Sequence, residues 1–235
     1  MHAGKDGWMY VMDAATGNVL FEDNAALSVK RRYALVHAHE MSHQWFGDLV
    51  TPAWWNDLWL NESFATWMEH KTTTAWDPKG EFDRGGLADA LGVMSLDAKK
   101  SARPIAQPSE AMDDIQNAFD GITYEKGNAV LAMFEHYYGV ENFRKGVQLH
   151  LTRHASGNAT ANDFFASIAD ANHDEKGVAA FRSFIDQAGV PVVQTSLDCT
   201  GAPQVSLSQS RYVEAGAGTA PQQTWKVPMC ISAGD

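Results

Sequence analysis

Apolar and polar positions follow two different spacings along the chain, and the change lies near residue 190. Before it, apolar residues recur mostly every three or four positions, which predicts helices. After Val190-Pro191, short runs of β-branched and polar residues predict strands at 192–197, 204–208 and 224–231. Apolar runs at 8–12 and 19–21, separated by turn residues, predict an N-terminal β-hairpin. The pattern therefore predicts a mainly α chain with β segments at both ends.

Two of the predicted helices enclose a tryptophan-rich loop. Ser28 is a suitable N-cap for the first helix, and Gly47 is suited to end it. The second begins near Asn61 or Glu62 and runs to about Trp76, before the helix-breaking Asp77-Pro78. Tyr33, Val36, Met41 and Trp45 recur at helical spacing in the first helix. Tyr33, Val36, Trp45 and Phe46 predict that this helix is largely buried.

The rest of the α region also divides into helices. The stretch from Glu81 is mostly helical, with a loop at 101–107 marked by prolines. Thr160 and Asp163 are spaced as a capping box, which predicts the start of a helix. Further helices are predicted at 124–138, 141–154, about 161–171 and 178–188.

The first helix carries the motif His39-Glu40-Met41-Ser42-His43. Residues four apart lie on one helix face, so the two imidazoles can converge on one Zn²⁺. Glu40 adjoins the first histidine and can act as general base on a water. Glu62 opens the second helix, which returns over the histidines, and two histidines with one glutamate form a common catalytic zinc set. The motif predicts a zinc metallopeptidase site.

A histidine pair at this spacing can also be an ordinary helix surface. The apolar residues around the motif argue against that interpretation, because they predict a buried helix. Buried histidines and glutamates are costly unless they are satisfied, and a metal ion satisfies them.

A longer set of motifs is similar to a known family. Residues 39–52, Trp54-Trp55 and 59–65 resemble the aminopeptidase N family of gluzincin zinc metallopeptidases, and residues 121–127 resemble its tyrosine motif. The resemblance extends from about Asn24 to the C-terminus. It implies a thermolysin-like helical lobe, followed after residue 190 by the start of a small β-sandwich domain.

The same resemblance assigns roles to individual residues. It implies that His39, His43 and Glu62 hold one zinc ion and that Glu40 is the general base. Tyr124 would donate a hydrogen bond to the tetrahedral oxyanion. The predicted function is a zinc-dependent aminopeptidase that hydrolyses peptides with a free N-terminus.

The chain departs from the family upstream of the zinc motif. The family holds the substrate ammonium with the Glu of a Gly-x-Met-Glu-Asn motif, whereas Gly7-Trp8-Met9-Tyr10-Val11 has Tyr and Val in its place. No residue is assigned to that role, and the substrate-binding residues stay unknown. We expect a fragment: residues 1–190 as a catalytic domain without its N-terminal β part, and 191–235 as a truncated β-sandwich. A zinc endopeptidase and a catalytically incomplete zinc-binding module remain alternatives.

The composition of the chain limits the classes of partner that it can bind. With 29 acidic against 18 basic residues the net charge is −11, which argues against nucleic acid or an anionic membrane as the main partner. No apolar run reaches the roughly 20 residues of a membrane span, and the first seven residues do not resemble a signal peptide. Cys199 and Cys230 predict either a cross-strand disulfide or two buried thiols. The disulfide and the habit of the family favour a periplasmic or secreted location.

Overall fold

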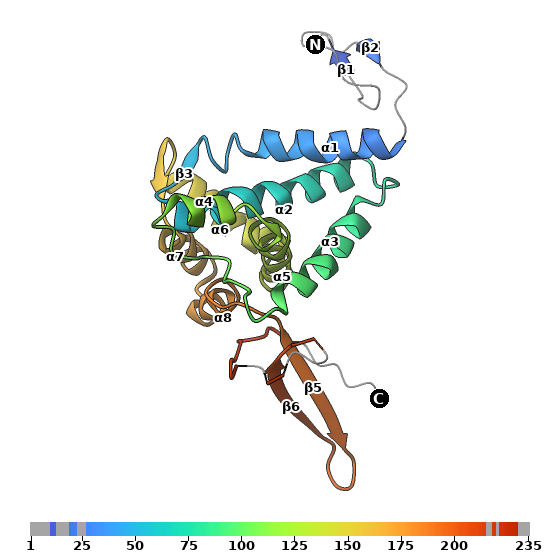
Figure 1. Ribbon diagram of the computed structural model, residues 1–235, viewed down its shortest axis with the longest axis vertical. Coiled ribbons are helices and arrows are strands. Elements are labelled where there is room, and N and C mark those ends of the chain that lie inside the picture. The colour runs from blue at the N-terminus through green and yellow to red at the C-terminus, as the bar shows by residue number, and fades with distance from the viewer. Residues whose placement is uncertain (1–9, 13–18, 23–26, 215–217, 220, 230–235) are drawn as a thin grey trace.

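Helices dominate the computed structural model, which describes residues 10–12, 19–22, 27–214, 218–219 and 221–229 (Figure 1). The predicted N-terminal hairpin is confirmed as β1 (Tyr10–Met12) paired antiparallel with β2 (Val19–Glu22). The predicted helices are present within a few residues of their expected bounds. They are α1 (Leu27–Ser42), α2 (Trp59–Trp76), α3 (Phe82–Asp97), α4 (Met112–Asn117), α5 (Gly127–Tyr138), α6 (Val140–Arg153), α7 (Ala161–Asn172) and α8 (Glu175–Ile185).

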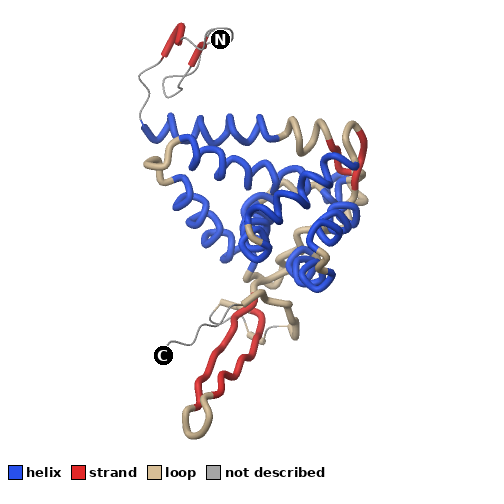
Figure 2. Tube along the Cα trace, turned by 180° about the vertical axis from the view of Figure 1, so that it is seen from behind, coloured by secondary structure: helices blue, strands red, loops and turns tan. Residues whose placement is uncertain are grey.

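Helix α1 lies beside α2 along one edge of the helical body (Figures 1 and 2). The prediction that α1 is largely buried was wrong. Tyr33, Val36 and Trp45 are between 39% and 50% exposed, and Met41 is 60% exposed. Of the residues expected to be buried, Phe46 is, and it lies beyond the end of the helix. Helical spacing shows which side chains share a face, but the neighbours available at the edge of the bundle decide whether that face is covered.

The end of α1 also differs from the prediction. The helix stops at Ser42 rather than at Gly47, and residues 43–49 form successive turns. Because the chain turns here, Phe46 enters the core, where its ring stacks on Phe64 at 4.5 Å between centroids. Because α1 ends early, His43 is the first residue of the turn rather than part of the helix.

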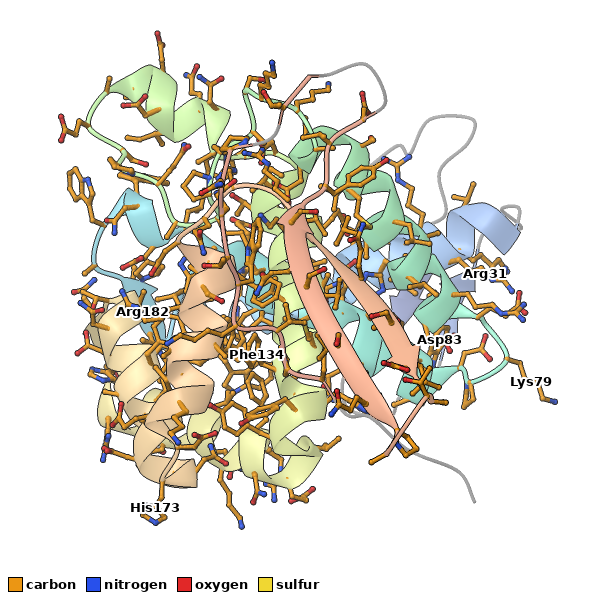
Figure 3. All side chains as sticks on the ribbon, turned by 90° about the horizontal axis from the view of Figure 1, so that it is seen from below. Arg31, Lys79, Asp83, Phe134, His173 and Arg182 are labelled. Atoms are coloured by element: carbon orange, nitrogen blue, oxygen red, sulfur yellow. The ribbon has the colours of Figure 1, made fainter. Side chains whose placement is uncertain are left out.

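An aromatic core joins α2, α5, α7 and α8. Phe134 is fully buried and stacks on Phe181 with ring centroids 4.3 Å apart (Figure 3). Phe164 meets both Phe181 and Phe64 edge-on, at 5.9 Å and 5.2 Å. Buried aromatic pairs add about 0.5–1.5 kcal/mol each beyond the area they bury. This cluster holds α2, and therefore Glu62, at a set distance from the rest of the body.

A short parallel strand pair was not predicted. β3 (Val50–Pro52) follows the turns after α1 and pairs with β4 (Gly157–Ala159), which lies between α6 and α7. Ser156 also donates its backbone N–H to the carbonyl of Leu49 at 2.6 Å. Strands of three residues are too short for their periodicity to be recognised in the sequence. The pair nevertheless links the segment after the histidine motif to the connection between α6 and α7.

The C-terminal β segment is one antiparallel hairpin in the described residues. β5 (Pro191–Asp198) pairs with β6 (Gln204–Arg211) in continuous register and projects away from the helices (Figure 2). The strand predicted at 224–231 was wrong over 224–229, where no strand forms. In this segment, backbone N–H groups bond to side chains instead of to a neighbouring strand. The Trp225 amide donates to Gln209 Oε1 at 2.8 Å, and the Lys226 amide donates to Ser183 Oγ at 3.0 Å.

The remaining sequence predictions meet the structure only in part. None of the described helices is long and apolar enough to cross a membrane. Cys199 is exposed at the end of β5, and Cys230 lies outside the described residues, so their disulfide stays a prediction. The Thr160–Asp163 capping box is confirmed by the 3.3 Å bond from the Asp163 amide to Thr160 Oγ1 and its reciprocal at 2.8 Å.

Buried His150 on α6 makes the fold sensitive to acid. It is 4% exposed, packs edge-on to Phe164 and lies 5.2 Å from the ring of His154. Burial, with a smaller effect of His154, lowers the pKa of His150 to about 4. Below about pH 6.5 the unfolded chain therefore binds a proton that the folded chain does not. The free energy of unfolding should fall by on the order of 3 kcal/mol between pH 6.5 and pH 4 from this residue.

Urea unfolding of wild type and His150→Leu across this pH range measures the effect. The difference in stability between the two proteins should change by the stated amount between pH 6.5 and 4. His173→Asn, at an exposed histidine, serves as the control and should follow wild type (Figure 3). Parallel profiles for wild type and His150→Leu would contradict the prediction.

Candidate metal centre

Three residues singled out from the sequence meet where α1 packs on α2. His39 lies in the last turn of α1, His43 directly after that helix and Glu62 in the first turn of α2, with their ligand atoms within 4.8 Å of one another. Glu62 Oε2 lies 3.3 Å from His39 Nε2 and 3.7 Å from His43 Nε2. Two imidazole nitrogens and one carboxylate oxygen at this separation suit a tetrahedral Zn²⁺ with one position left open.

The other nitrogen of each imidazole is engaged. His39 Nδ1 donates to Glu69 Oε2 at 2.8 Å, and His43 Nδ1 donates to Asn61 Oδ1 at 2.7 Å and to the Phe46 carbonyl at 3.0 Å. A proton on Nδ1 leaves Nε2, on the side of Glu62, as the nitrogen of each ring that can bind a metal ion. Such partners fix the tautomer and the ring orientation of metal-binding histidines.

Glu69 and Asn61 were missed in the sequence analysis. Glu69 lies seven residues, or about two helical turns, after Glu62, so both carboxylates share one face of α2. That spacing was readable once Glu62 had been placed. Asn61 directly precedes Glu62, and its role depends on the turn after α1, which no local pattern predicts.

Gly47 makes room for the Asn61 side chain. Its φ of +139° is rarely adopted by other residues, and a Cβ there would lie 2.7 Å from Asn61 Oδ1. Any larger residue would push Asn61 away from His43. The glycine is therefore part of the support of the histidine rather than a simple helix end.

Tyr124 lies beside the three residues, in a π-helical turn at Ile122–Lys126 that runs directly into α5. Its ring stacks near His39 with centroids 5.9 Å apart. The prediction of one regular helix over 124–138 was thus incomplete at its start. Single π-helical turns inside helices frequently occur at functional sites, where the extra residue redirects a side chain.

Close packing holds this turn against α2. Ser63 Oγ donates to the Thr123 carbonyl at 2.6 Å. A Cβ at Gly127 would lie only 2.0 Å from Ser63 Oγ, so only glycine fits there. Arg103 fixes the other side, because its Nη2 donates to Asp120 Oδ1 at 2.5 Å and to Thr123 Oγ1 at 2.7 Å. These contacts fix the chain next to Tyr124 and place the tyrosine beside Glu62, with which its phenol also interacts.

The charges around the site act in one direction. Burial lowers the pKa of His39, but Glu62 and Glu69 outweigh it and raise the value to about 9. Burial, followed by the charges of Glu62 and Glu40, raises the pKa of Tyr124 well above its usual range, so the phenol keeps its proton and remains a donor. The site thus concentrates negative charge, which a divalent cation neutralises. Glu40 is exposed on α1 beside His39.

Comparison with known proteins agrees with this geometry. Residues 8–187 match the Peptidase family M1 domain. The chain belongs to peptidase family M1. Among its M1 relatives it is 38% identical to the Tricorn protease-interacting factor F2 of Thermoplasma volcanium over 89% of this chain and 26% of that protein. It is 37% identical to Probable aminopeptidase 2 of Sulfurisphaera tokodaii, over 91% of this chain and 27% of the relative.

A plant relative gives the same result. Aminopeptidase M1 of Arabidopsis thaliana is 35% identical over 91% of this chain and 24% of its own length. The chain spans about a quarter of the length of these M1 relatives. Family M1 comprises metallopeptidases, which accords with a group of two histidines and one glutamate able to hold a metal ion.

Glu69 should tune the affinity of the metal centre. Replacing it by Gln removes the carboxylate that orients His39 while leaving the three proposed ligands in place. We expect zinc affinity to fall about 10–100-fold, as for other partners of metal-binding histidines. Competition with a chromophoric chelator measures this change.

Glu141→Gln is the matched control, because Glu141 is an exposed glutamate whose ion pair within the described part of the chain is with Arg144 on its own helix. It should bind zinc as wild type does. Equal affinity for Glu69→Gln and wild type would show that Glu69 does not orient the ligand.

Proposed function

We propose that this chain carries the zinc-binding part of an aminopeptidase that hydrolyses the N-terminal residue of peptides. The observation that supports it most is the convergence of His39 Nε2, His43 Nε2 and Glu62 Oε2, with Tyr124 alongside. The aminopeptidase names of several M1 relatives support the substrate class. In this proposal residues 1–190 form a thermolysin-like catalytic lobe, and 191–235 begin a β-sandwich domain.

The proposed ligands are His39, His43 and Glu62, and the donor set fits one Zn²⁺. When bound, zinc supplies a Lewis acid that polarises the scissile carbonyl and lowers the pKa of water to about 7. Glu40 follows His39 on α1 and is exposed, so its carboxylate is free to take a proton from water. It then passes the proton to the leaving amine, which is general acid–base catalysis by one residue.

Tyr124 is proposed to stabilise the oxyanion. Its phenol stays protonated because burial and the carboxylates of Glu62 and Glu40 oppose ionisation. A neutral donor held by the π-helical turn needs little reorganisation when charge develops on the carbonyl oxygen. Its position follows from the packing of Thr123 and Gly127 on Ser63.

The alternatives differ in how the substrate is held. An aminopeptidase needs an acidic group for the substrate ammonium, and we assign none. Of the nearest motif, Tyr10 and Val11 lie in β1, and Gly7, Trp8 and Met9 lie outside the described residues. A zinc endopeptidase needs no such group, and an incomplete zinc-binding module would hold the metal without turnover.

A comparison of two substrates tests the proposed function. The zinc-loaded chain should cleave a leucyl chromogenic amide but not its N-acetylated form, and Glu40→Gln should abolish cleavage because the base is lost. Glu110→Gln, at an exposed glutamate remote in sequence, is the control and should retain activity. Metal content of each protein is measured in parallel.

The outcomes separate the three interpretations. Cleavage of blocked and free peptides alike would support an endopeptidase. No cleavage with one zinc bound would support the incomplete module, and no zinc at all would contradict the proposed centre.

Tyr124→Phe tests the oxyanion donor separately. Loss of one preorganised donor should lower kcat about 10²–10³-fold. Zinc affinity should change little, because the phenol is not a proposed ligand. A matched substitution, Tyr137→Phe, affects a half-exposed tyrosine on α5 and should leave kcat unchanged. An unchanged kcat in Tyr124→Phe would remove this residue from the mechanism.

A further inference from the structure

A second group of potential metal ligands lies outside the proposed catalytic centre. His70 on α2, Asp89 on α3 and Glu125 in the π-helical turn bring one ligand atom each to within 4.8 Å of the others. The three come from separate elements that are held together by the packing of α2, α3 and α5. One imidazole and two carboxylates form a donor set suited to Zn²⁺ and similar divalent transition-metal ions.

Two atoms of this group are buried without a partner. His70 Nδ1 and Glu125 Oε2 are shielded from solvent, and neither hydrogen-bonds to any atom of the described residues. A buried polar atom left unsatisfied costs about 1–3 kcal/mol, so such atoms in a native structure call for a water molecule, a ligand or an ion. Gly86 packs on the His70 imidazole, where a Cβ would lie 3.2 Å from the ring. The ring is therefore confined by α3 rather than free to turn to solvent.

The negative charge of this group is balanced only in part, by His39. Burial, and then the charges of Asp89 and Glu69, raise the pKa of Glu125 to about 7. Glu69 itself is shared: its Oε2 binds His39 Nδ1 at 2.8 Å, and its Oε1 lies 3.8 Å from His70 Nε2. Among the described residues, no Lys or Arg forms an ion pair with Asp89, Glu69 or Glu125 in this structure.

We infer that His70, Asp89 and Glu125 form a second binding site for a divalent transition-metal ion such as Zn²⁺, distinct from the site at His39, His43 and Glu62. The cation would accept the lone pairs of the two buried atoms. Asp89 is exposed, which leaves an entry path and room for water to complete the coordination. Bound there, the ion links α2 and α3 to the π-helical turn that carries Tyr124.

Zinc stoichiometry tests the site directly. Equilibrium dialysis against excess Zn²⁺, followed by elemental analysis, should give two equivalents for wild type. Asp89→Asn and Glu125→Gln should each give one. Asp83→Asn, which removes another exposed carboxylate from the same helix, is the matched control and should give two (Figure 3).

His43→Ala separates this inference from the proposed catalytic centre. The His43→Ala protein should lose the zinc equivalent bound at His39, His43 and Glu62 and keep the equivalent bound at His70, Asp89 and Glu125. A single equivalent in wild type that disappears in His43→Ala would overturn the second site and leave the first intact. A second equivalent that persists in both Asp89→Asn and Glu125→Gln would also overturn it, since that ion would be bound elsewhere.

Thermal unfolding supplies a readout independent of activity. The second zinc equivalent should raise the Tm of wild type and Asp83→Asn, because an ion that binds the folded state stabilises it. It should leave the Tm of Asp89→Asn unchanged. An equal rise in Asp89→Asn would contradict the site.

Discussion

The pairing of α1 with α2 is the constraint on which the rest of this structure depends. The end of α1 lies against the start of α2. His39 and His43 therefore face Glu62, although Glu62 comes much later in the chain. Histidines and a carboxylate gathered at less than 4 Å are unfavourable in isolation unless protons or a cation balance them. Trp59 and Phe64 anchor α2 in the aromatic core and so help to hold this arrangement.

Side chains beyond the three proposed ligands orient the residues of the proposed centre. Glu69 and Asn61 hold the two imidazoles through Nδ1, and Gly47 leaves the space that Asn61 occupies. Each of these contacts is local in space but crosses an element boundary. The turn after α1 therefore helps to orient His43. The short β3–β4 pair anchors this turn to the segment between α6 and α7.

The π-helical turn connects the proposed catalytic centre with the inferred second site. Tyr124 points toward His39, and the next residue, Glu125, belongs to the group with His70 and Asp89. Glu69 lies between the two groups, with one oxygen on His39 and the other 3.8 Å from His70. The partly buried carboxylate of Glu69 is therefore shared between the two groups, and the charge of His39 also acts on Glu125.

The sequence by itself determined the helix-rich architecture and the residues of the centre. Helical periodicity placed α2 and the later helices, and the spacing of His39, Glu40 and His43, at and just beyond the end of α1, is a local property. It did not determine that α1 is half exposed and stops at Ser42, that Tyr124 lies in a π-helical turn, or that 224–229 forms no strand. Those features, with Glu69, Asn61 and the His70 group, depend on which distant segments become neighbours. Local spacing records which side chains share a face, whereas contacts between elements are decided by how the whole core packs.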